Sequence, residues 1–274
     1  MKFLISKALV LLAITAGILT FVSMSAFGQS IPSRAAIPRL PDGKPDFNGM
    51  WAGAAFSHKV GPGDTDTPSI TRYDKKLYEE LFKPGGEELF YRKHTGDLLH
   101  DDPQALCMPV GFPRVALSPY SQQWIQTPQN IVVLYEYMHF FRSIPIGAPN
   151  RPHDKDVELT WMGDSIGWWE GDTLVIDTIG LKEWPLAAEE PGRDDAVLYH
   201  SAALHVTERV RYTDPMLASY QLTYDDPKIF TKPWTTNWSM RFHPTWKILE
   251  MVCEENNRCR AGDCQLSPEQ KNQQ

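Results

Sequence analysis

The stretch ALHVTERVRYTDPMLASYQLTYDD at residues 203–226 carries the clearest structural signal in the chain. Apolar and polar residues alternate on both sides of Thr213-Asp214-Pro215, which is a turn sequence. Alternation with a period of two residues is typical of β-strands that bury one face. These residues are therefore predicted to form two antiparallel strands joined by a tight turn.

Three further pairs of short apolar runs flank turn residues in the same way. The pairs are QQWIQT with NIVVLYEYMHFFRSI around residues 128–130, SIGWWE with TLVIDTIGL around 171–172, and NWSMRFH with WKILEMVCEE around 244–245. Asn, Gly, Asp and Pro at such positions favour hairpins. Eight strands joined in this order predict a mainly β fold, an antiparallel meander that closes into a lipocalin-like β-barrel.

The rest of the chain has a less regular pattern. Six prolines interrupt residues 29–70, which are predicted to be an irregular N-terminal segment. One short helix is expected near residues 73–83, because apolar side chains share a helical face there before Pro84-Gly85-Gly86. Residues 29–266 are expected to form a single β-rich domain, and residues 267–274 a disordered tail.

The N-terminus has the three parts of a secretory signal peptide. Lys2 and Lys7 form a positive region, residues 8–22 are uncharged, and small residues precede a predicted cut after Gly28. The uncharged run of about 15 residues is shorter than the roughly 20 that span a membrane. Residues 1–28 are therefore predicted to be removed during export to the periplasm or the exterior, which leaves no membrane anchor.

Composition limits what the exported chain binds. Removing Lys2 and Lys7 from the 27 basic residues leaves 25 against 34 acidic ones, a formal charge of −9. An acidic surface repels phosphate backbones, so no nucleic-acid partner is expected. The chain has no Gly-rich phosphate loop and no dinucleotide fingerprint, and no cofactor is predicted. These patterns leave the oligomeric state undetermined.

The chain has four cysteines, an even number that suits an oxidising compartment. Three pairings are possible. We favour Cys107–Cys253, which closes a long loop, together with Cys259–Cys264, which closes a tight loop in the tail. A zinc site is the weaker alternative, because no C-x-x-C pair occurs.

Five stretches of the chain resemble a large set of uncharacterised exported proteins of Gram-negative bacteria. They are LPDGKPDFNGMW, TWMGDSIGWWEGDTLVIDT, HVTERV, YDDPKIFTKPW and EMVCEEN, and WEGDTLVIDT is the most specific part. The resemblance covers most of the chain after residue 28. It implies export and a single β-rich domain, and it implies no established reaction.

Two acidic residues interrupt apolar rows of the predicted strands. Alternation places Glu208 in a row of Leu and Val residues, and it places Asp177 with Val175 and Ile179. A carboxylate inside an apolar wall is costly unless it is paired or protonated. If both acids face one cavity, they predict a general acid and a general base.

Each acid also has a structural interpretation. In this interpretation Glu208 forms an ion pair with an arginine of a neighbouring strand, and the candidates are Arg209, Arg241 and Arg142. In the same interpretation Asp177 forms hydrogen bonds with backbone groups at a bulge near Gly180. Both interpretations stay open at the level of sequence.

Histidines and arginines complete the candidate catalytic site. His200 precedes a strand and His139 lies on one, so either is a candidate proton shuttle. Arg209 or Arg241 is a candidate electrostatic clamp. No metal site is predicted, although the sequence leaves open whether a metal binds the histidines His153, His200 and His205.

Aromatic residues on the predicted strands are candidate substrate contacts. The candidates are Trp168, Trp169, Tyr135 and Trp238. Because neighbours in a strand point to opposite faces, Trp168 and Trp169 cannot both lie in the interior. Packing in the core is the alternative role for most of them.

These residues favour an exported, cofactor-free acid/base enzyme of the lyase, isomerase or hydratase kind that acts on a small apolar or aromatic molecule. Two alternatives remain: a periplasmic lipocalin-like binding protein for an apolar ligand, and a glycan-binding or glycan-degrading domain. A Ser-His-Asp hydrolase is less favoured, because no G-x-S-x-G string occurs.

Overall fold

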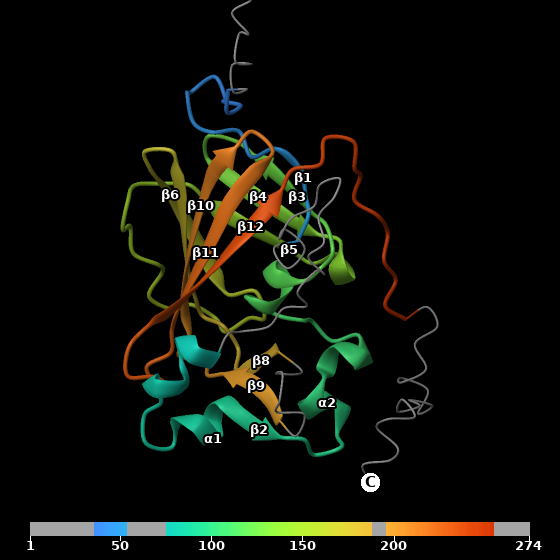
Figure 1. Cartoon of the computed structure of the whole chain (residues 1–274), viewed down its shortest axis with the longest axis vertical. Helices are drawn as coiled ribbons and strands as arrows, with labels where there is room; N and C mark the ends of the chain where they lie inside the picture. Colours follow the sequence, from blue (N-terminus) through green and yellow to red (C-terminus); the bar gives the residue numbers. More distant parts are fainter. Residues whose placement is uncertain (1–35, 54–74, 188–195, 255–274) are drawn as a thin grey trace, which may run out of the picture. The chain divides into compact units, whose positions relative to one another are not determined.

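The computed structural model describes residues 36–53, 75–187 and 196–254. This part of the chain is mainly β, and its strands pair antiparallel in three sheets (Figure 1). The predicted signal peptide, the predicted Cys259–Cys264 disulfide, the tail and the bounds of the predicted single domain lie outside the described residues.

The first sheet has four strands in the order β1-β3-β4-β5. Its strands are β1 (Gly49–Trp51), β3 (Gln122–Gln126), β4 (Asn130–Tyr135) and β5 (Phe141–Pro145). Buried and less buried residues alternate along β4 and β5, as expected for strands that turn one face to a core. The Pro128-Gln129 turn joins β3 to β4, which confirms that predicted hairpin.

The second sheet has five strands in the order β12-β11-β10-β7-β6. They are β6 (Asp164–Glu170), β7 (Thr173–Ile179), β10 (His205–Asp214), β11 (Leu217–Asp225) and β12 (Trp234–Arg241). Figure 1 shows β10, β11 and β12 side by side. The predicted hairpins at residues 171–172 and 213–215 are confirmed by the pairing of β6 with β7 and of β10 with β11.

A third sheet, β2-β9-β8, interrupts the predicted meander between β7 and β10. Its strands are β2 (Tyr91–Lys93), β8 (Trp184–Ala187) and β9 (Ala196–His200), and the short helices α1 (Gly86–Phe90) and α2 (Leu98–Asp101) lie beside it in Figure 1. Every residue of β9 is buried, so this strand has no alternation that sequence analysis detects.

One hydrophobic core joins the two larger sheets. It contains Trp124 and Ile144 from the first sheet and Val206 and Leu222 from the second. The edges of these sheets meet at isolated bridges rather than along a continuous ladder in the described part of the chain. Ile146 bridges to Gly167 at one edge, and Trp51 bridges to Phe242 at the other.

The predicted helix near residues 73–83 is confirmed only in part, because its described residues form 3-10 turns rather than one α-helix. Two short 3-10 turns, Lys75–Leu77 and Glu79–Leu81, occupy this region. The core takes up Tyr78, whose ring packs against Phe90 and Trp234, whereas Leu77 on the predicted helical face is 40% exposed. Contacts made far along the chain therefore override the local helical pattern.

Two predicted strands also need correction. The run 130–144 is divided by a 3-10 turn at Tyr137–His139, where Met138 and His139 have positive φ angles of 57° and 53°. Residues 246–254 form no strand. They run along this turn instead, and the amide of Met251 donates to Nε2 of His139 at 2.8 Å.

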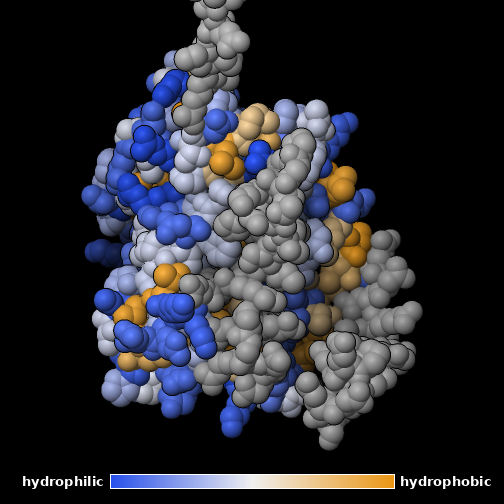
Figure 2. Space-filling view, viewed as in Figure 1, coloured by the Kyte–Doolittle hydropathy of each residue, from blue (hydrophilic) through white to orange (hydrophobic). Residues whose placement is uncertain are grey.

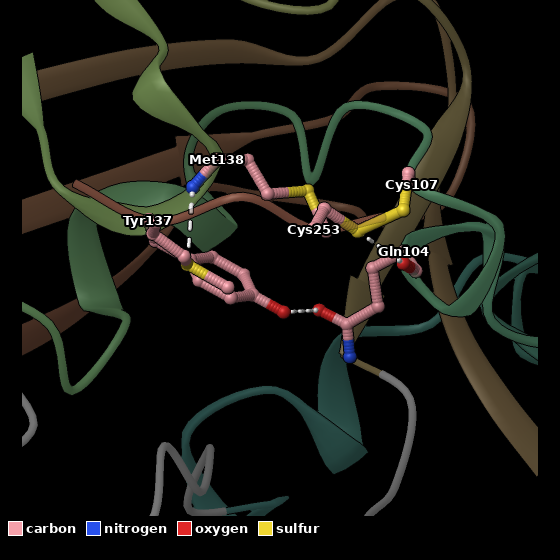
Figure 3. The surroundings of a disulfide bond; sticks show 6 residues. Gln104, Cys107, Tyr137, Met138 and Cys253 are labelled. Atoms are coloured by element: carbon pink, nitrogen blue, oxygen red, sulfur yellow. Dashed lines mark hydrogen bonds between the residues drawn. A yellow bond between two sulfur atoms is a disulfide. The ribbon is translucent and has the colours of Figure 1, made fainter. Parts of the chain in front are cut away.

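The predicted disulfide between Cys107 and Cys253 is confirmed (Figure 3). It ties the 3-10 turn Pro103–Leu106 to the segment that follows β12. Next to it, the hydroxyl of Tyr137 donates to Oε1 of Gln104 at 2.9 Å. A disulfide fits a protein outside the cytoplasm. Within the ranges that the structure describes, no helix is both long and apolar enough to cross a membrane.

Candidate functional site

The two predicted acids lie on opposite faces of the second sheet. Residues that pair directly across antiparallel strands point to the same face. Glu208 pairs with Ile176, whereas Asp177 pairs with Thr207. The expectation that Glu208 and Asp177 face each other across a cavity is therefore wrong. The register of β7 and β10 places Ile176, and not its neighbour Asp177, on the same face as Glu208.

On the inner face, Glu208 forms an ion pair with Arg142 of β5. Nη1 and Nη2 of Arg142 donate to Oε1 and Oε2 of Glu208 at 3.1 and 2.6 Å. Both side chains are at most 2% exposed, so this pair is shielded from water and connects the two larger sheets. Of the three arginines that the sequence offered, the buried one is the partner.

Further groups complete this inner ion-pair cluster. The hydroxyl of Tyr220 donates to Oε1 of Glu208 at 2.5 Å, and Nη2 of Arg142 lies 2.9 Å from Oγ of Ser165 and 3.0 Å from Oγ1 of Thr178. Burial raises the pKa of Tyr220 well above its ordinary value, and the charge of Glu208 adds to this. The charges of Arg142 and Glu208 cancel, as expected of a structural ion pair, although the buried Nε of Arg142 has no hydrogen-bond partner among the described residues.

On the outer face, Asp177 lies between two imidazoles. Its Oδ1 is 2.5 Å from Nε2 of His205, and its Oδ2 is 3.1 Å from Nε2 of His153. His205 is the first residue of β10, while His153 comes from the loop at 147–163. The hydroxyl of Thr207 also donates to Oδ1 of Asp177, at 3.3 Å.

A second carboxylate extends this arrangement. Nδ1 of His153 is 2.6 Å from Oδ2 of Asp164, so His153 bridges two carboxylates with its two ring nitrogens. We call the row His205–Asp177–His153–Asp164 the outer acid/base cluster.

The loop that carries His153 approaches the sheet closely because Gly163 precedes Asp164. Gly163 has a φ of 68°, and a Cβ atom there would lie 2.6 Å from the carbonyl oxygen of Ile179. Only glycine allows both this conformation and this approach. The bridge between Thr160 and Leu181 holds the same loop along the end of β7.

The outer acid/base cluster shifts the ionisation of its members. Burial disfavours the charged form of Asp177, but hydrogen bonds and charges from His205 and His153 outweigh burial and lower its pKa. The hydrogen bond to Asp177 raises the pKa of His205, and the nearby charge of Asp225 acts in the same direction. An ionised aspartate thus stabilises the imidazolium of His205.

The two ring nitrogens of His205 have different surroundings. Its Nε2 faces Asp177, and within the described ranges no residue hydrogen-bonds its Nδ1. The side chain is 41% exposed, whereas His153 is 10% exposed. A carboxylate that orients one nitrogen of an imidazole while the other is accessible is the arrangement of a general base.

The two histidines that were predicted as proton shuttles lie elsewhere. His200 ends β9 and is buried, and its Nδ1 contacts the carbonyl of its neighbour Ser201. Burial lowers the pKa of His200. His139 lies in a turn rather than on a strand, and it accepts from the amide of Met251. Neither is a member of the inner or the outer cluster.

The predicted electrostatic clamps are also separated from Glu208. Arg209 is on the outer face and donates to Glu170 at 2.6 Å. Arg241 is the last residue of β12, and its backbone carbonyl accepts from Ala52. Alternation along β10 and β12 places both arginines on the face away from Glu208.

The four aromatic candidates are divided between the faces. Trp168 is buried on the outer face with Ile166 and Val175. Trp169 packs against the main core. Two candidates are buried in that core: Tyr135, whose pKa burial raises to about 12, and Trp238, whose indole N–H donates to Thr236. The expectation that Trp168 and Trp169 point to opposite faces is confirmed.

His205, His153 and Asp164 are members of a candidate site that the sequence did not assemble. The signal needed was the register between β7 and β10, which places His205 beside Asp177. The described residues contain no group of three or more His, Cys, Asp or Glu that is arranged to hold a metal ion.

Comparisons of the chain with family models, with curated proteins and with solved structures give no match. The resemblance to exported proteins of Gram-negative bacteria therefore stays a prediction.

Proposed function

We propose that the protein is an acid/base enzyme of the lyase, isomerase or hydratase kind, with His205 as its general base. The single observation that carries this proposal is the contact between Nε2 of His205 and Asp177, which leaves Nδ1 directed away from the aspartate. Asp177 and Thr207 then serve as positioning residues. Compared with the sequence-based hypothesis, Asp177 is retained, and His205 replaces His200 and His139.

The proposed chemistry is a proton transfer. Nδ1 of His205 takes a proton from the substrate, and the electron pair of the broken bond stays on the substrate. In a lyase the electron pair expels a leaving group, and the imidazolium of His205 then gives its proton to that group or to water. In an isomerase the imidazolium returns the proton to another atom of the substrate. Asp177 stabilises the imidazolium that forms, and general base catalysis of this kind contributes about 10²–10⁴-fold to a rate.

Position on the sheet narrows the expected substrate. The area over β6 and β10 is hydrophilic to intermediate in Figure 2, and the apolar group Ile166, Trp168 and Val175 beside Asp177 on the outer face is buried. This surface favours the polar, proton-yielding group of a small molecule, and an apolar or aromatic remainder of the substrate stays a sequence-based proposal.

Deuterium incorporation tests the proposal without a known substrate. The mature protein is incubated in D2O with a panel of small carbon acids, and mass spectrometry follows the uptake of deuterium. We expect uptake in at least one class, and a decrease of about 10²–10⁴-fold in His205→Gln and Asp177→Asn.

The matched control is His94→Gln. His94 is 40% exposed, close to the 41% of His205, and it lies beside Asp101, away from this cluster. Uptake in this variant is expected to equal that of the wild type. No uptake from any compound, or equal uptake in His205→Gln and the wild type, would overturn the proposal. Retention of an unchanged ligand would favour the binding-protein alternative.

We also propose that the two larger sheets close into a barrel-like form. The support is that both pairs of edges meet: the amide of Gly147 donates to Gly167 at one edge, and that of His243 donates to Met50 at the other, each at 2.9 Å. Slow amide hydrogen exchange at Gly147 and His243 is expected, and exchange as fast as in an open loop would contradict closure.

Export to the periplasm or the exterior is proposed on two grounds. One is the N-terminal signal pattern, and the other is the disulfide between Cys107 and Cys253. The measurement is the mass of the protein recovered from the periplasm of a Gram-negative host, which is expected to begin at Gln29. A cytoplasmic protein that retains Met1–Gly28 would contradict it.

A further inference from the structure

The inner and outer clusters are attached to adjacent residues of the same two strands. Ser165 and Thr178 contact the guanidinium of Arg142 on the inner face, and they pair directly across β6 and β7. Their chain neighbours Asp164 and Asp177 are the two carboxylates that His153 bridges on the outer face. Consecutive Cα atoms lie about 3.8 Å apart, so a movement of one member of each pair moves the other.

The geometry points to Arg142 as a positioning residue that holds Asp164 and Asp177 at the separation that His153 spans. This inference rests on the proposed function, because it concerns the same outer acid/base cluster. Arg142 belongs to β5 in the first sheet, so it reaches β6 and β7 across the core. The inner cluster therefore acts on the outer one through the backbone of the sheet.

The hydrogen bonds of the Arg142 guanidinium explain why it holds β6 and β7 together. Nη2 of Arg142 has two hydrogens, and three acceptors lie within 3.0 Å: Oε2 of Glu208, Oγ of Ser165 and Oγ1 of Thr178. Glu208 accepts one of these hydrogens, and the hydroxyls of Ser165 and Thr178 share the other. The two hydroxyl oxygens also lie 3.0 Å from each other. One guanidinium thus fixes the Ser165–Thr178 pair as a unit.

Mechanical positioning, rather than charge, is the physical link. Glu208 neutralises Arg142 beneath the sheet, and the groups that shift the pKa of Asp177 are His205 and His153. Two carboxylates repel each other, and a rigid spacing with the imidazole between them offsets this repulsion. If the spacing relaxes, Asp177 moves away from His205 as well.

The test uses variants that release β6 and β7 without breaking the ion pair. Thr178→Val removes one hydroxyl at nearly constant shape, and Ser165→Ala removes the other. The matched control is Tyr220→Phe, which removes a hydrogen bond to Glu208 at 2.5 Å but leaves both hydroxyls on β6 and β7 in place. All three variants lose one buried hydroxyl of the same cluster.

The readout is the pKa of His205, followed by NMR of its ring nitrogens in the full mature protein. The charged groups that face His205 are Asp177 of β7 and Asp225, the last residue of β11, which pairs directly with His205. We expect Thr178→Val and Ser165→Ala to lower the pKa of His205 by about 0.5 unit, roughly what one weakened hydrogen bond contributes. Tyr220→Phe is expected to lower the unfolding midpoint and leave this pKa unchanged.

Two results would overturn the inference: an unchanged His205 pKa in both hydroxyl variants, or an equal shift in Tyr220→Phe. If one hydroxyl variant does not fold, the other decides. This outcome is separable from the proposed function, because NMR reads His205 without a substrate. Shifted pKa values without deuterium uptake would reject the enzyme and retain the positioning role. Deuterium uptake without a shift in the pKa of His205 would retain the enzyme and reject the positioning role of Arg142.

Discussion

Replacing Glu208 by Gln is expected to destabilise the protein strongly while preserving its shape. The carboxylate of Glu208 accepts three hydrogen bonds, two from Arg142 and one from Tyr220. The amide of Gln keeps one oxygen as an acceptor. Its NH2 group faces a donor of Arg142 or Tyr220 and cannot accept a hydrogen bond from it. The positive charge of Arg142 then remains buried without a counter-charge.

The size of the effect follows from the burial of the pair. Glu208 and Arg142 are 1% and 2% exposed, so water does not replace the lost partner. Removing one member of a buried ion pair costs about 3–5 kcal/mol. For a domain of 150–250 residues, each kcal/mol lowers the melting temperature by about 2–4 °C, so the expected decrease is about 6–20 °C.

Urea unfolding of the oxidised protein measures this cost through the unfolding midpoint and slope. A second variant, Arg142→Met with Glu208→Gln, is expected to cost less than the sum of its single variants, because neither charge is left alone. The control is Arg209→Gln, next to Glu208 on β10 but facing outward to the exposed Glu170. Its midpoint is expected to equal that of the wild type.

Two results would refute this reasoning about the inner ion-pair cluster. The first is an unfolding midpoint of Glu208→Gln that equals that of Arg209→Gln. The second is strict additivity of the Arg142 and Glu208 substitutions, which would mean that the two charges do not interact. In either case Glu208 would not connect the two larger sheets.

Three shorter predictions concern the disulfide, the outer acid/base cluster and Asp101. Replacing Cys107 and Cys253 by Ser is expected to cost about 2–5 kcal/mol, because the disulfide joins positions 146 residues apart in the sequence; equal urea midpoints would contradict this. Because Asp177 raises the pKa of His205 above 6.5, their contact stabilises the folded state fully below about pH 6.5 and loses this effect as the pH rises through the folded value. The stability difference between wild type and Asp177→Asn, measured by urea unfolding above pH 5, should therefore fall with rising pH, and a rising difference would be inconsistent. Hydrogen bonds that Asp101 accepts from His100 and from the amides of Thr95 and Gly96 outweigh its burial and lower its pKa from 3.8 to about 2. Its contribution is thus present above about pH 3.8 and lost as the pH falls toward 2, and Asp101→Asn should remove this acid dependence from thermal unfolding curves.

Strand prediction was most direct where one face of a strand is buried and the other is not. The run that contains Glu208 has this alternation over its whole length, and β10 and β11 form as expected. Prediction failed for β9, which is buried on both faces, and for residues 246–254, whose apolar pattern follows contacts with the turn at His139. A local period reports the burial of a face, and it reports nothing about which partner buries it.

The candidate site was predicted in part. Sequence analysis selected Asp177, which is a member of the outer acid/base cluster. It paired Asp177 with the wrong acid, because the face of one strand relative to another depends on their register. A shift of one residue exchanges the two faces, and no pattern within a single strand reports it.

The sequence by itself predicted short antiparallel strands, placed Glu208 in an apolar row, and favoured the pairing of Cys107 with Cys253. The strands and the place of Glu208 depend on the local pattern of residue types, and the disulfide depends on a choice among only three pairings of four cysteines. Tertiary structure alone decided that Arg142 neutralises Glu208 from the opposite sheet, and that His153 reaches Asp177 from a loop. Such contacts join residues 24 to 66 positions apart, and their geometry is set by how the sheets pack and pair.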